Sequence, residues 1–246
     1  MMNKPLKYIL ITLGTITGLF VILATVYLFF FTSMKKEMNL IDTGEIIPGI
    51  YTAKVSFVNL FLYRTPSGFI AVDAGTDSAS VKKELDKLNI DPALVSAVFL
   101  THTDADHAGG IKLFKKARVY ISVDEEQMIN GKTSRFLMFG NKLPCKYEML
   151  TDNSEINTDS TNVKAIATPG HTPGSMSFLI SGKYLFTGDC MSLKSGKAAK
   201  LASFINSDNN TATASIKKLK KLVGVEYIFT AHYGYTGDFN KAFSSW

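Results

Sequence analysis

Histidine residues mark the parts of this chain that could do chemistry. There are four. His102 and His107 lie in Thr101-His-Thr-Asp-Ala-Asp-His-Ala-Gly-Gly110, His171 in Thr168-Pro-Gly-His-Thr-Pro-Gly-Ser175, and His232 in Phe229-Thr-Ala-His-Tyr-Gly-Tyr235. Thr187-Gly-Asp-Cys190 supplies one more carboxylate, Asp189. Imidazole nitrogens and carboxylate oxygens suit Zn, Fe and Mn, so these segments predict a metal site.

Each of these segments follows a stretch that predicts a β-strand. The stretches are 95–100 before His102, 163–168 before His171, 183–186 before Asp189 and 226–230 before His232. Loops at strand ends, held by a rigid scaffold, are where functional residues concentrate. A lone histidine is more often structural, but four histidines at such junctions favour one shared site.

The remaining pattern predicts the scaffold. Further strands are expected at 49–53, 58–64, 69–73, 118–123 and 175–180, and helices at 78–88, 110–116, 124–130, 208–223 and 236–244. Two batches of strands, each followed by helices, predict two packed sheets with helices outside. We therefore expect an α/β protein (α+β in some schemes) with an αββα four-layer sandwich.

The amino-terminal residues differ from the rest of the chain. Residues 8–31 are uncharged and strongly apolar; as a helix they would span roughly 36 Å, enough to cross a hydrocarbon core of about 30 Å. A cleaved signal peptide is the alternative, but its apolar core has about 7–15 residues and ends at a small-x-small site. We expect a membrane anchor and linker in residues 1–37 and one domain in residues 38–246.

Charge gives limited information about orientation and partners. Lys4 and Lys7 precede the apolar stretch and Lys35 and Lys36 follow it, which only slightly favours an inside amino terminus and an extracytoplasmic domain. The net charge of +6 fits contact with anionic lipid, an anionic substrate or an ordinary lysine-rich surface. No basic run with interleaved aromatics indicates nucleic-acid binding. The sequence does not indicate an oligomeric state.

The ordered motifs resemble those of the metallo-β-lactamase superfamily. The resemblance rests on His102-Thr-Asp-Ala-Asp-His-Ala-Gly-Gly110, Pro169-Gly-His-Thr-Pro-Gly174, Thr187-Gly-Asp189 and Ala231-His-Tyr-Gly234, and it covers roughly residues 45–246. It implies an αββα sandwich with two metal ions at one edge. The implied ligands are His102, residue 104 and His171 for the first ion, Asp106, His107 and His232 for the second, and Asp189 between them.

Asp104 departs from the family pattern. The usual motif is H-x-H-x-D-H, and this chain has Asp104 in place of the second histidine. If Asp104 binds, three carboxylates surround two dications, which lowers Lewis acidity and shifts preference from Zn toward Fe or Mn. If it does not bind, the first ion is weakly held or absent. A superfamily branch with a carboxylate here, the flavodiiron proteins, uses iron, but this chain lacks their flavodoxin-like domain.

Other residues near the motifs allow further expectations. True β-lactamases of this superfamily generally lack a bridging aspartate, so Asp189 favours another hydrolase subclass. Cys190 is expected to be a packing residue, and whether Cys145 and Cys190 pair is open. Lys194 and Lys197 could bind an anionic substrate or belong to a solvated loop. Tyr233 could donate to a developing oxyanion or simply pack.

These features favour a membrane-anchored hydrolase with two divalent ions, Zn or Fe/Mn. A bridging hydroxide would attack an ester, lactone, thioester or phosphodiester, and Asp106 would orient it or carry a proton. The expected partners are a small-molecule substrate and the lipid around the anchor. A di-iron redox enzyme and a non-catalytic metal-binding sensor are the alternatives.

Overall fold

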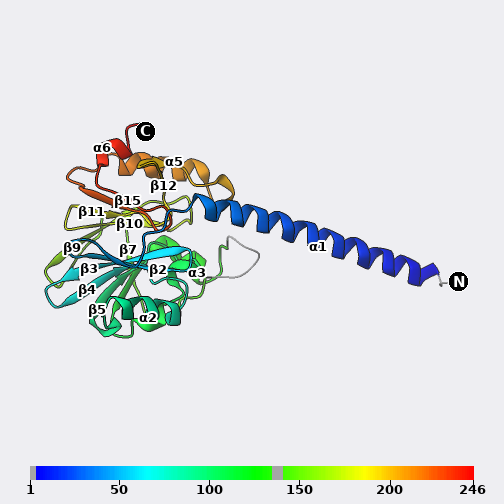
Figure 1. Cartoon of the computed structure of the whole chain (residues 1–246), viewed down its shortest axis with the longest axis horizontal. Coiled ribbons are helices and arrows are strands. Elements are labelled where there is room, and N and C mark those ends of the chain that lie inside the picture. The colour runs from blue at the N-terminus through cyan, green and yellow to red at the C-terminus, as the bar shows by residue number, and fades with distance from the viewer. Residues whose placement is uncertain (1–3, 135–140) are drawn as a thin grey trace. The chain divides into compact units, whose positions relative to one another are not determined.

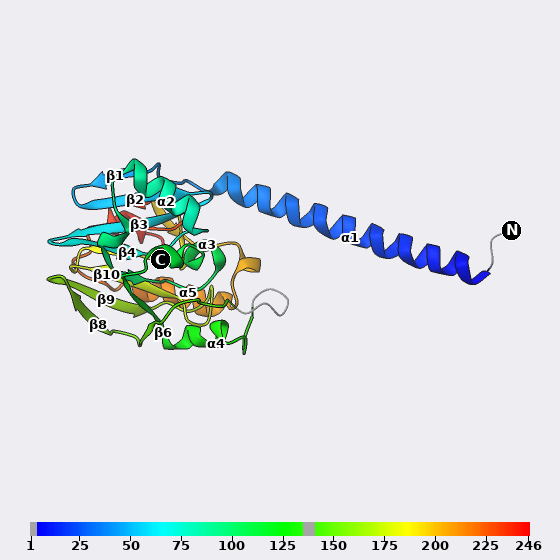
Figure 2. The same cartoon turned by 90° about the horizontal axis from the view of Figure 1, so that it is seen from below.

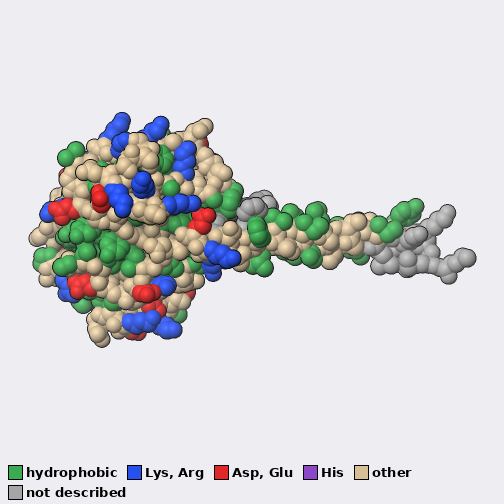
Figure 3. Space-filling view, turned by 45° about the horizontal axis from the view of Figure 1, so that its top comes forward, with side chains coloured by type: hydrophobic (Ala, Val, Ile, Leu, Met, Phe, Trp, Pro, Cys, Tyr) green, Lys and Arg blue, Asp and Glu red, His purple; other side chains and the backbone are tan. Residues whose placement is uncertain are grey.

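The computed structural model describes residues 4–134 and 141–246, and the chain divides into two compact units, Met1–Met38 and Asn39–Trp246. The first unit is α1 (Lys4–Glu37), whose stretch Ile11–Phe29 has a mean hydropathy of 2.0 and is long and apolar enough to cross a membrane. A signal sequence would meet the same criterion. Apolar side chains line its surface (Figure 3). The hydroxyls of Thr12 and Thr25 donate to carbonyls one turn earlier, which satisfies these polar groups inside the helix.

The second unit contains two large sheets between helices (Figures 1 and 2). The seven-stranded sheet has the order β1 (Gly44–Ile47), β2 (Ile50–Val55), β3 (Val58–Thr65), β4 (Gly68–Val72), β5 (Val95–Phe99), β6 (Arg118–Ser122) and β7 (Glu148–Leu150). The six-stranded sheet has the order β15 (Tyr235–Thr236), β14 (Tyr227–Phe229), β11 (Tyr184–Phe186), β10 (Met176–Ile180), β9 (Thr161–Ala167) and β8 (Glu155–Thr158). A separate hairpin pairs β12 (Ser192–Lys194) with β13 (Lys197–Ala199).

Helices cover the two outer faces of this sandwich. In Figure 1, α2 (Ser78–Lys87) lies outside the first sheet, and α5 (Asn209–Leu219) and α6 (Phe239–Ala242) lie outside the second. Shorter helices are α3 (Ala105–Ala108), α4 (Glu126–Ile129), η1 (Pro92–Leu94), η2 (Ile111–Leu113), η3 (Val123–Glu125) and η4 (Ser203–Ile205). The expected αββα sandwich is therefore present.

Alternate residues of β5 face opposite sides of the first sheet, and both sides are covered by apolar clusters. Along β5, Ala97 and Phe99 pack in the cluster between the sheets, whereas Val98 packs in the cluster beneath α2. Phe99 stacks on Tyr120 of β6 with ring centroids 4.7 Å apart. Both clusters are apolar, so the strand is a nearly continuous apolar run, as expected for strands buried on both faces.

Some predicted elements differ from the structure. The helix expected at 110–116 is only the short η2, and residues 236–244 divide into the end of β15 and the four-residue α6. Lys194 and Lys197, for which a solvated loop was one alternative, lie in the β12–β13 hairpin, and η4 follows it. The short strands β1, β7 and β8 were not anticipated. These differences occur in elements of two to four residues, where period alone carries little information.

Candidate metal centre

Loops after four strands bring the seven predicted ligands together. His102 lies after β5, His171 after β9, Asp189 after β11 and His232 after β14, so both sheets contribute. The short helix α3 adds Asp106 and His107, and Asp104 is the residue that precedes α3. The four imidazoles are 0–5% exposed.

The first ligand group contains His102, Asp104 and His171. Asp104 Oδ2 lies 3.6 Å from His102 Nε2 and 3.4 Å from His171 Nε2. Asp189 Oδ2 is 3.4 Å from the same His171 nitrogen. The carboxylate of Asp104 therefore occupies the place at which the family pattern has an imidazole.

The second ligand group contains Asp106, His107 and His232. Asp106 Oδ2 lies 3.6 Å from His107 Nε2 and 3.4 Å from His232 Nε2. Asp189 Oδ1 is 3.6 Å from His107 Nε2 and 3.3 Å from His232 Nε2. Asp189 thus directs a different oxygen toward each group.

These separations fit a cation better than hydrogen bonds. Two donors about 2.1 Å from one ion at the tetrahedral angle are roughly 3.4 Å apart, whereas N–H···O bonds are about 2.7–3.2 Å long. Among the described residues, Nε2 of His102 and of His107 are buried without a hydrogen-bond partner. Buried polar atoms are normally satisfied, so the two groups have the donor types and spacing to hold two divalent ions.

The outer nitrogens of three imidazoles have fixed partners. His107 Nδ1 is 2.8 Å from Asp73 Oδ2, His232 Nδ1 is 2.6 Å from the carbonyl of Phe57, and His102 Nδ1 is 3.0 Å from Thr101 Oγ1. Such contacts fix the tautomer that leaves Nε2 free to bind. Asp73 also accepts from the backbone and hydroxyl of Thr101, so one buried carboxylate orders two ligand positions.

Electrostatics in the cluster favour positive charge. Burial opposes protonation of His107, but Asp106, Asp73 and Asp189 outweigh it and raise the pKa of His107 to about 10. Burial likewise opposes a charged His232, yet Asp189 raises its pKa. Burial disfavours ionisation of Asp189, but His232 and His107 hold its pKa well below its usual range. The carboxylates therefore favour cations inside the cluster.

At Gly109 and Gly188, the absence of a side chain lets the backbone lie close to neighbouring atoms. At Gly109, which has φ of −63°, an added Cβ would lie 1.9 Å from the carbonyl oxygen of Thr76. At Gly188, a φ of +50° adds conformational strain, and a Cβ would approach the side chain of Thr101 to 2.5 Å. Gly109 thus permits a close backbone approach, whereas the positive φ is found at Gly188, beside Asp189.

Glu125 joins the two loops that carry the first ligand group. Its carboxylate is fully buried and accepts from the backbone and hydroxyl of Thr103 at 2.9 and 2.7 Å. Its other oxygen accepts from the hydroxyl of Thr172 at 2.6 Å and from the backbone of Gly174 at 3.2 Å. The loop of His171 is also fixed from the other side, because Ser207 donates its backbone and hydroxyl hydrogens to the His171 carbonyl.

The predicted substrate residues lie in two places. Tyr233 is next to His232, 8% exposed, with its ring 6.2 Å from the imidazole. Lys194 and Lys197 flank the turn of the β12–β13 hairpin, and an added Cβ at Gly196 in that turn would be 3.9 Å from Lys241. Their part in substrate binding stays a prediction.

Cysteine chemistry does not contribute to the cluster. Cys145 and Cys190 are both free. Burial raises the pKa of the Cys190 thiol to about 12, which disfavours the thiolate that a metal requires. This agrees with a packing role for Cys190.

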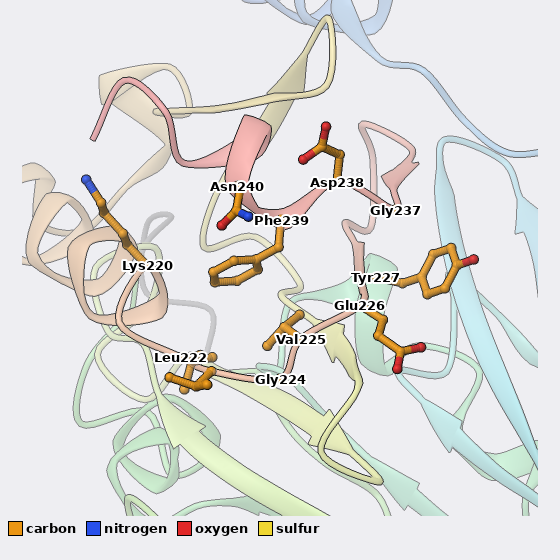
Figure 4. A pocket seen from close by; sticks show the side chains of 11 residues that line it. Lys220, Leu222, Gly224, Val225, Glu226, Tyr227, Gly237, Asp238, Phe239 and Asn240 are labelled. Carbon is orange, nitrogen blue, oxygen red and sulfur yellow. The ribbon is translucent and has the colours of Figure 1, made fainter.

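A separate hollow lies beside the end of α5 (Figure 4). Its lining includes Lys220, Glu226, Tyr227, Asp238 and Phe239 and none of the predicted metal ligands. Glu226 pairs with Lys183 at 2.7 Å, and Asp238 accepts from the backbone of Lys241 as the cap of α6. These carboxylates already have structural partners, so we assign the hollow no role.

Asp73, Glu125 and Asn141 contact the candidate ligands or their loops, but they were not predicted from the sequence. Asp73 has a recognisable signal, since it ends an apolar strand and precedes Ala74-Gly75. Glu125 and Asn141 have no local signal. They reach the loop of residues 103–104 from segments 22–38 positions away in the chain.

Several known proteins are similar to this chain in sequence. The chain is 30% identical over 167 residues to a probable metallo-hydrolase of Methanocaldococcus jannaschii, covering 67% of this chain and 71% of that protein. It is 28% identical to a probable polyketide biosynthesis zinc-dependent hydrolase of Bacillus velezensis and 31% identical to a hydroxyacylglutathione hydrolase of Serratia proteamaculans. These two alignments cover 51% and 49% of this chain but only 51% and 41% of the relatives.

Solved structures share the fold. A metallo-β-lactamase of Cronobacter sakazakii with a HARLDQ motif superposes with a TM-score of 0.62 at 24% identity over 80% of both chains. A B3 metallo-β-lactamase described as having an active-site glutamic acid gives 0.65 at 20% identity over 87% of this chain and 89% of that one. The sequence model of the family described as "Metallo-beta-lactamase superfamily" matches residues 53–232, and this range includes every predicted ligand. By this match over most of its length, by its αββα sandwich and by its ordered motifs, the chain belongs to the metallo-β-lactamase superfamily.

Proposed function

We propose that this protein is a membrane-anchored, metal-dependent hydrolase with a dinuclear centre. Its substrate would be a small molecule with an ester, lactone, thioester or phosphodiester bond, and it would not be a true β-lactamase. The observation that carries the proposal is Asp189, whose two oxygens lie 3.3–3.6 Å from imidazoles of both ligand groups. Two divalent ions held there would supply a hydroxide at neutral pH and polarise the bond to be cleaved.

The chain's own residues would hold the centre and move the proton. The imidazoles would bind through Nε2, and Asp73, Phe57 and Thr101 fix the tautomers of His107, His232 and His102, respectively. Asp106 is 21% exposed at its side chain, more than Asp189 at 9%. That access suits Asp106 to accept a proton at its carboxylate and to return it to the leaving group.

The names of relatives support hydrolysis and a divalent metal. One is a probable zinc-dependent hydrolase and another a hydroxyacylglutathione hydrolase. Because the alignments cover about half of these proteins, they support the reaction class and not a particular substrate. The zinc-dependent relative favours Zn, whereas the carboxylate of Asp104 favours Fe or Mn.

The amino-terminal helix supports membrane attachment. Ile11–Phe29 is long enough to span a bilayer, and this stretch is not buried within the protein. We propose a single-pass anchor, lipid as its partner and an extracytoplasmic catalytic domain. Membrane extraction requiring detergent would support the anchor, whereas loss of residues 1–37 from the mature chain would support a signal sequence.

Metal analysis combined with one substitution tests the centre. The full chain, purified in detergent without added metal, should carry divalent metal, and Asp189→Asn should lose at least one ion and nearly all hydrolysis because a neutral amide holds two dications poorly. Asp86→Asn is the matched control, since the exposed Asp86 pairs with Lys82 on α2. Full metal content in Asp189→Asn would exclude the bridging role.

A di-iron redox enzyme is the second candidate, and Asp104 is the observation that favours it. Its oxygen in the first ligand group makes that group harder than one with three imidazoles. Bound iron with visible absorption, and turnover that depends on an added electron donor, would favour redox chemistry. Hydrolysis of a model ester or phosphodiester without a donor would favour the first proposal.

A further inference from the structure

The two carboxylate oxygens of Asp104 face different neighbours. Oδ2 faces the first ligand group, 3.6 Å from His102 Nε2 and 3.4 Å from His171 Nε2. Oδ1 points the other way and accepts a hydrogen bond of 2.9 Å from the side-chain amide of Asn141. Asp104 therefore presents one oxygen to the imidazoles of the first ligand group and the other to Asn141.

Asn141 is itself anchored on both sides. Its backbone nitrogen donates to the carbonyl of Met128 at 3.0 Å, in the α4 helix whose Met128 side chain is buried. Its amide also approaches Thr103 Oγ1 at 3.3 Å. Thr103 in turn donates to the buried Glu125. The amide is thus placed by contacts that do not involve the ligand groups.

An amide donor has a specific advantage at this position. An aspartate has a short side chain whose terminal torsion is broad, so a carboxylate in place of an imidazole needs a partner to direct one oxygen inward. Partners of this kind orient metal ligands and affect metal affinity. A neutral amide supplies the hydrogen bond without adding charge to a centre that already contains Asp104, Asp106 and Asp189.

We propose that Asn141 is a positioning residue that holds Asp104 as a ligand of the first metal ion. Asn141 and Asp104 would then act as a pair that replaces the family's second histidine. This inference rests on the dinuclear centre of the proposed function and adds a residue that the ordered motifs do not contain.

Zn²⁺ binding to the full chain in detergent tests the pair. The metal-free protein is titrated with Zn²⁺ against a chelator of known affinity, for the parent, Asn141→Ala, Asn141→Asp, Asp104→Ala and the double variant Asp104→Ala/Asn141→Ala. Asn162→Ala is the matched control, because its amide approaches Glu155 and Asn157 on the β8–β9 strands instead.

The expected result is selective. Asn141→Ala should weaken one of the two Zn²⁺ sites about 10- to 100-fold and leave the other unchanged, as for other partners of metal ligands. Asn141→Asp should weaken it further, since two carboxylates would face each other. In the Asp104→Ala background, Asn141→Ala should add no loss. Asn162→Ala should match the parent.

Other outcomes overturn the inference. Unchanged Zn²⁺ affinity in Asn141→Ala, or an equal loss that persists without Asp104, would mean that Asn141 has only a structural role. Zn²⁺ binding unaffected by Asp104→Ala would remove the ligand that Asn141 is said to hold. The readout is metal affinity, so failure to find a hydrolysed substrate would count against the proposed function and leave this inference standing.

Discussion

Asp104 makes the first ligand group more anionic than an imidazole would. Its Oδ2 lies beside two imidazole nitrogens, and Asp189 Oδ2 lies beside one of them. An additional carboxylate donates more charge to the ion and makes water bound there less acidic. We therefore expect a carboxylate in place of the family's second histidine to affect both the preferred metal and the pH range of activity.

Asp104→His should shift metal preference from Fe or Mn toward Zn and lower the pH at which hydrolysis is half-maximal. The imidazole removes one anion from the centre, so the reacting water becomes more acidic. Asn141 can adapt, because its amide can rotate and accept from the new ring instead of donating. Metal content and pH–rate profiles of the two proteins provide the measurement. Unchanged metal preference and pH profile would argue that Asp104 is not a ligand.

The carboxylates around His107 change the pKa of its imidazole. Despite burial, Asp106, Asp73 and Asp189 raise its pKa to about 10, above the ordinary value of 6.5. In metal-free protein this protonated imidazole stabilises the fold fully below about pH 6.5, and the contribution is lost as pH rises toward 10. A bound ion requires the neutral imidazole, so metal and proton compete for one nitrogen.

Metal loading at pH 8 should therefore release a proton from His107. In a weakly buffered solution, Zn²⁺ added to metal-free protein should acidify the medium beyond a protein-free blank. The melting temperature of metal-free protein should also fall between pH 7 and pH 10, whereas metal-loaded protein should lack this component. Proton release no greater than the blank would mean that His107 is already neutral before metal binds.

Among the elements, the long periodic ones could be predicted from the sequence. Residues 78–88 and 208–223 were expected as helices and correspond to α2 (Ser78–Lys87) and α5 (Asn209–Leu219). The capping side chains Asp77 and Asp208 accept backbone hydrogen bonds at their starts, so local chemistry and period agree. The two-residue β15 and the three-residue β7 depend on pairing with distant strands, for which a local pattern contains no signal.

The same distinction holds at the candidate centre. The four histidines and Asp189 occur in short recognisable motifs, whereas Glu125 and Asn141 act only through contacts made by the fold. Thr103 meets Glu125 across 22 positions and Asp104 meets Asn141 across 37. Nothing in the β6–β7 connection shows these contacts in advance, because they require the loop after β5 to be folded.

Glu125→Gln should destabilise the protein and weaken the first ligand group. The Glu125 carboxylate accepts all four of its hydrogen bonds, two at each oxygen. In glutamine one of these oxygens becomes an NH₂ group, which would face two hydrogen-bond donors. Each buried donor left unsatisfied costs about 1–3 kcal/mol, and we expect a loss of at least about 2 kcal/mol. Chemical denaturation measures this loss, and Zn²⁺ titration measures affinity. Glu226→Gln is the control, because the half-exposed Glu226 pairs with Lys183 outside the ligand groups. Equal stability of the two variants would contradict the stabilising role of the hydrogen bonds that Glu125 accepts from both loops.

In the whole molecule, the ligands connect the ends of both sheets. Four imidazoles and three carboxylates converge from strands far apart in the chain, and without metal the protonated His107 offsets only part of the buried negative charge. Removing the metal should therefore lower the melting temperature of the full protein. A chelated sample, with metal loss confirmed by elemental analysis, should melt below the loaded one; coincident curves would indicate that metal does not stabilise this edge.

Residues 39–41, at the start of the second unit, contact the segments around His232. Asn39 donates its backbone hydrogen to the carbonyl of His232 at 3.0 Å. Ile41 exchanges hydrogen bonds of 3.0 and 2.7 Å with Asn59, whose backbone donates to Ala231 at 2.8 Å. Residues 39–41 therefore hold the loop that carries His232, although they immediately follow the predicted anchor.

A fragment of residues 38–246 should keep both metal ions, and a fragment of residues 42–246 should bind the second ion less tightly. The shorter fragment loses three hydrogen bonds of about 0.5–1.5 kcal/mol each, and the loop of His232 becomes less ordered. Zn²⁺ titration and thermal melting of the two fragments provide the comparison. Because both lack α1, any difference between them comes from residues 38–41 and not from loss of the membrane helix; identical affinities would show that the metal centre does not depend on this segment.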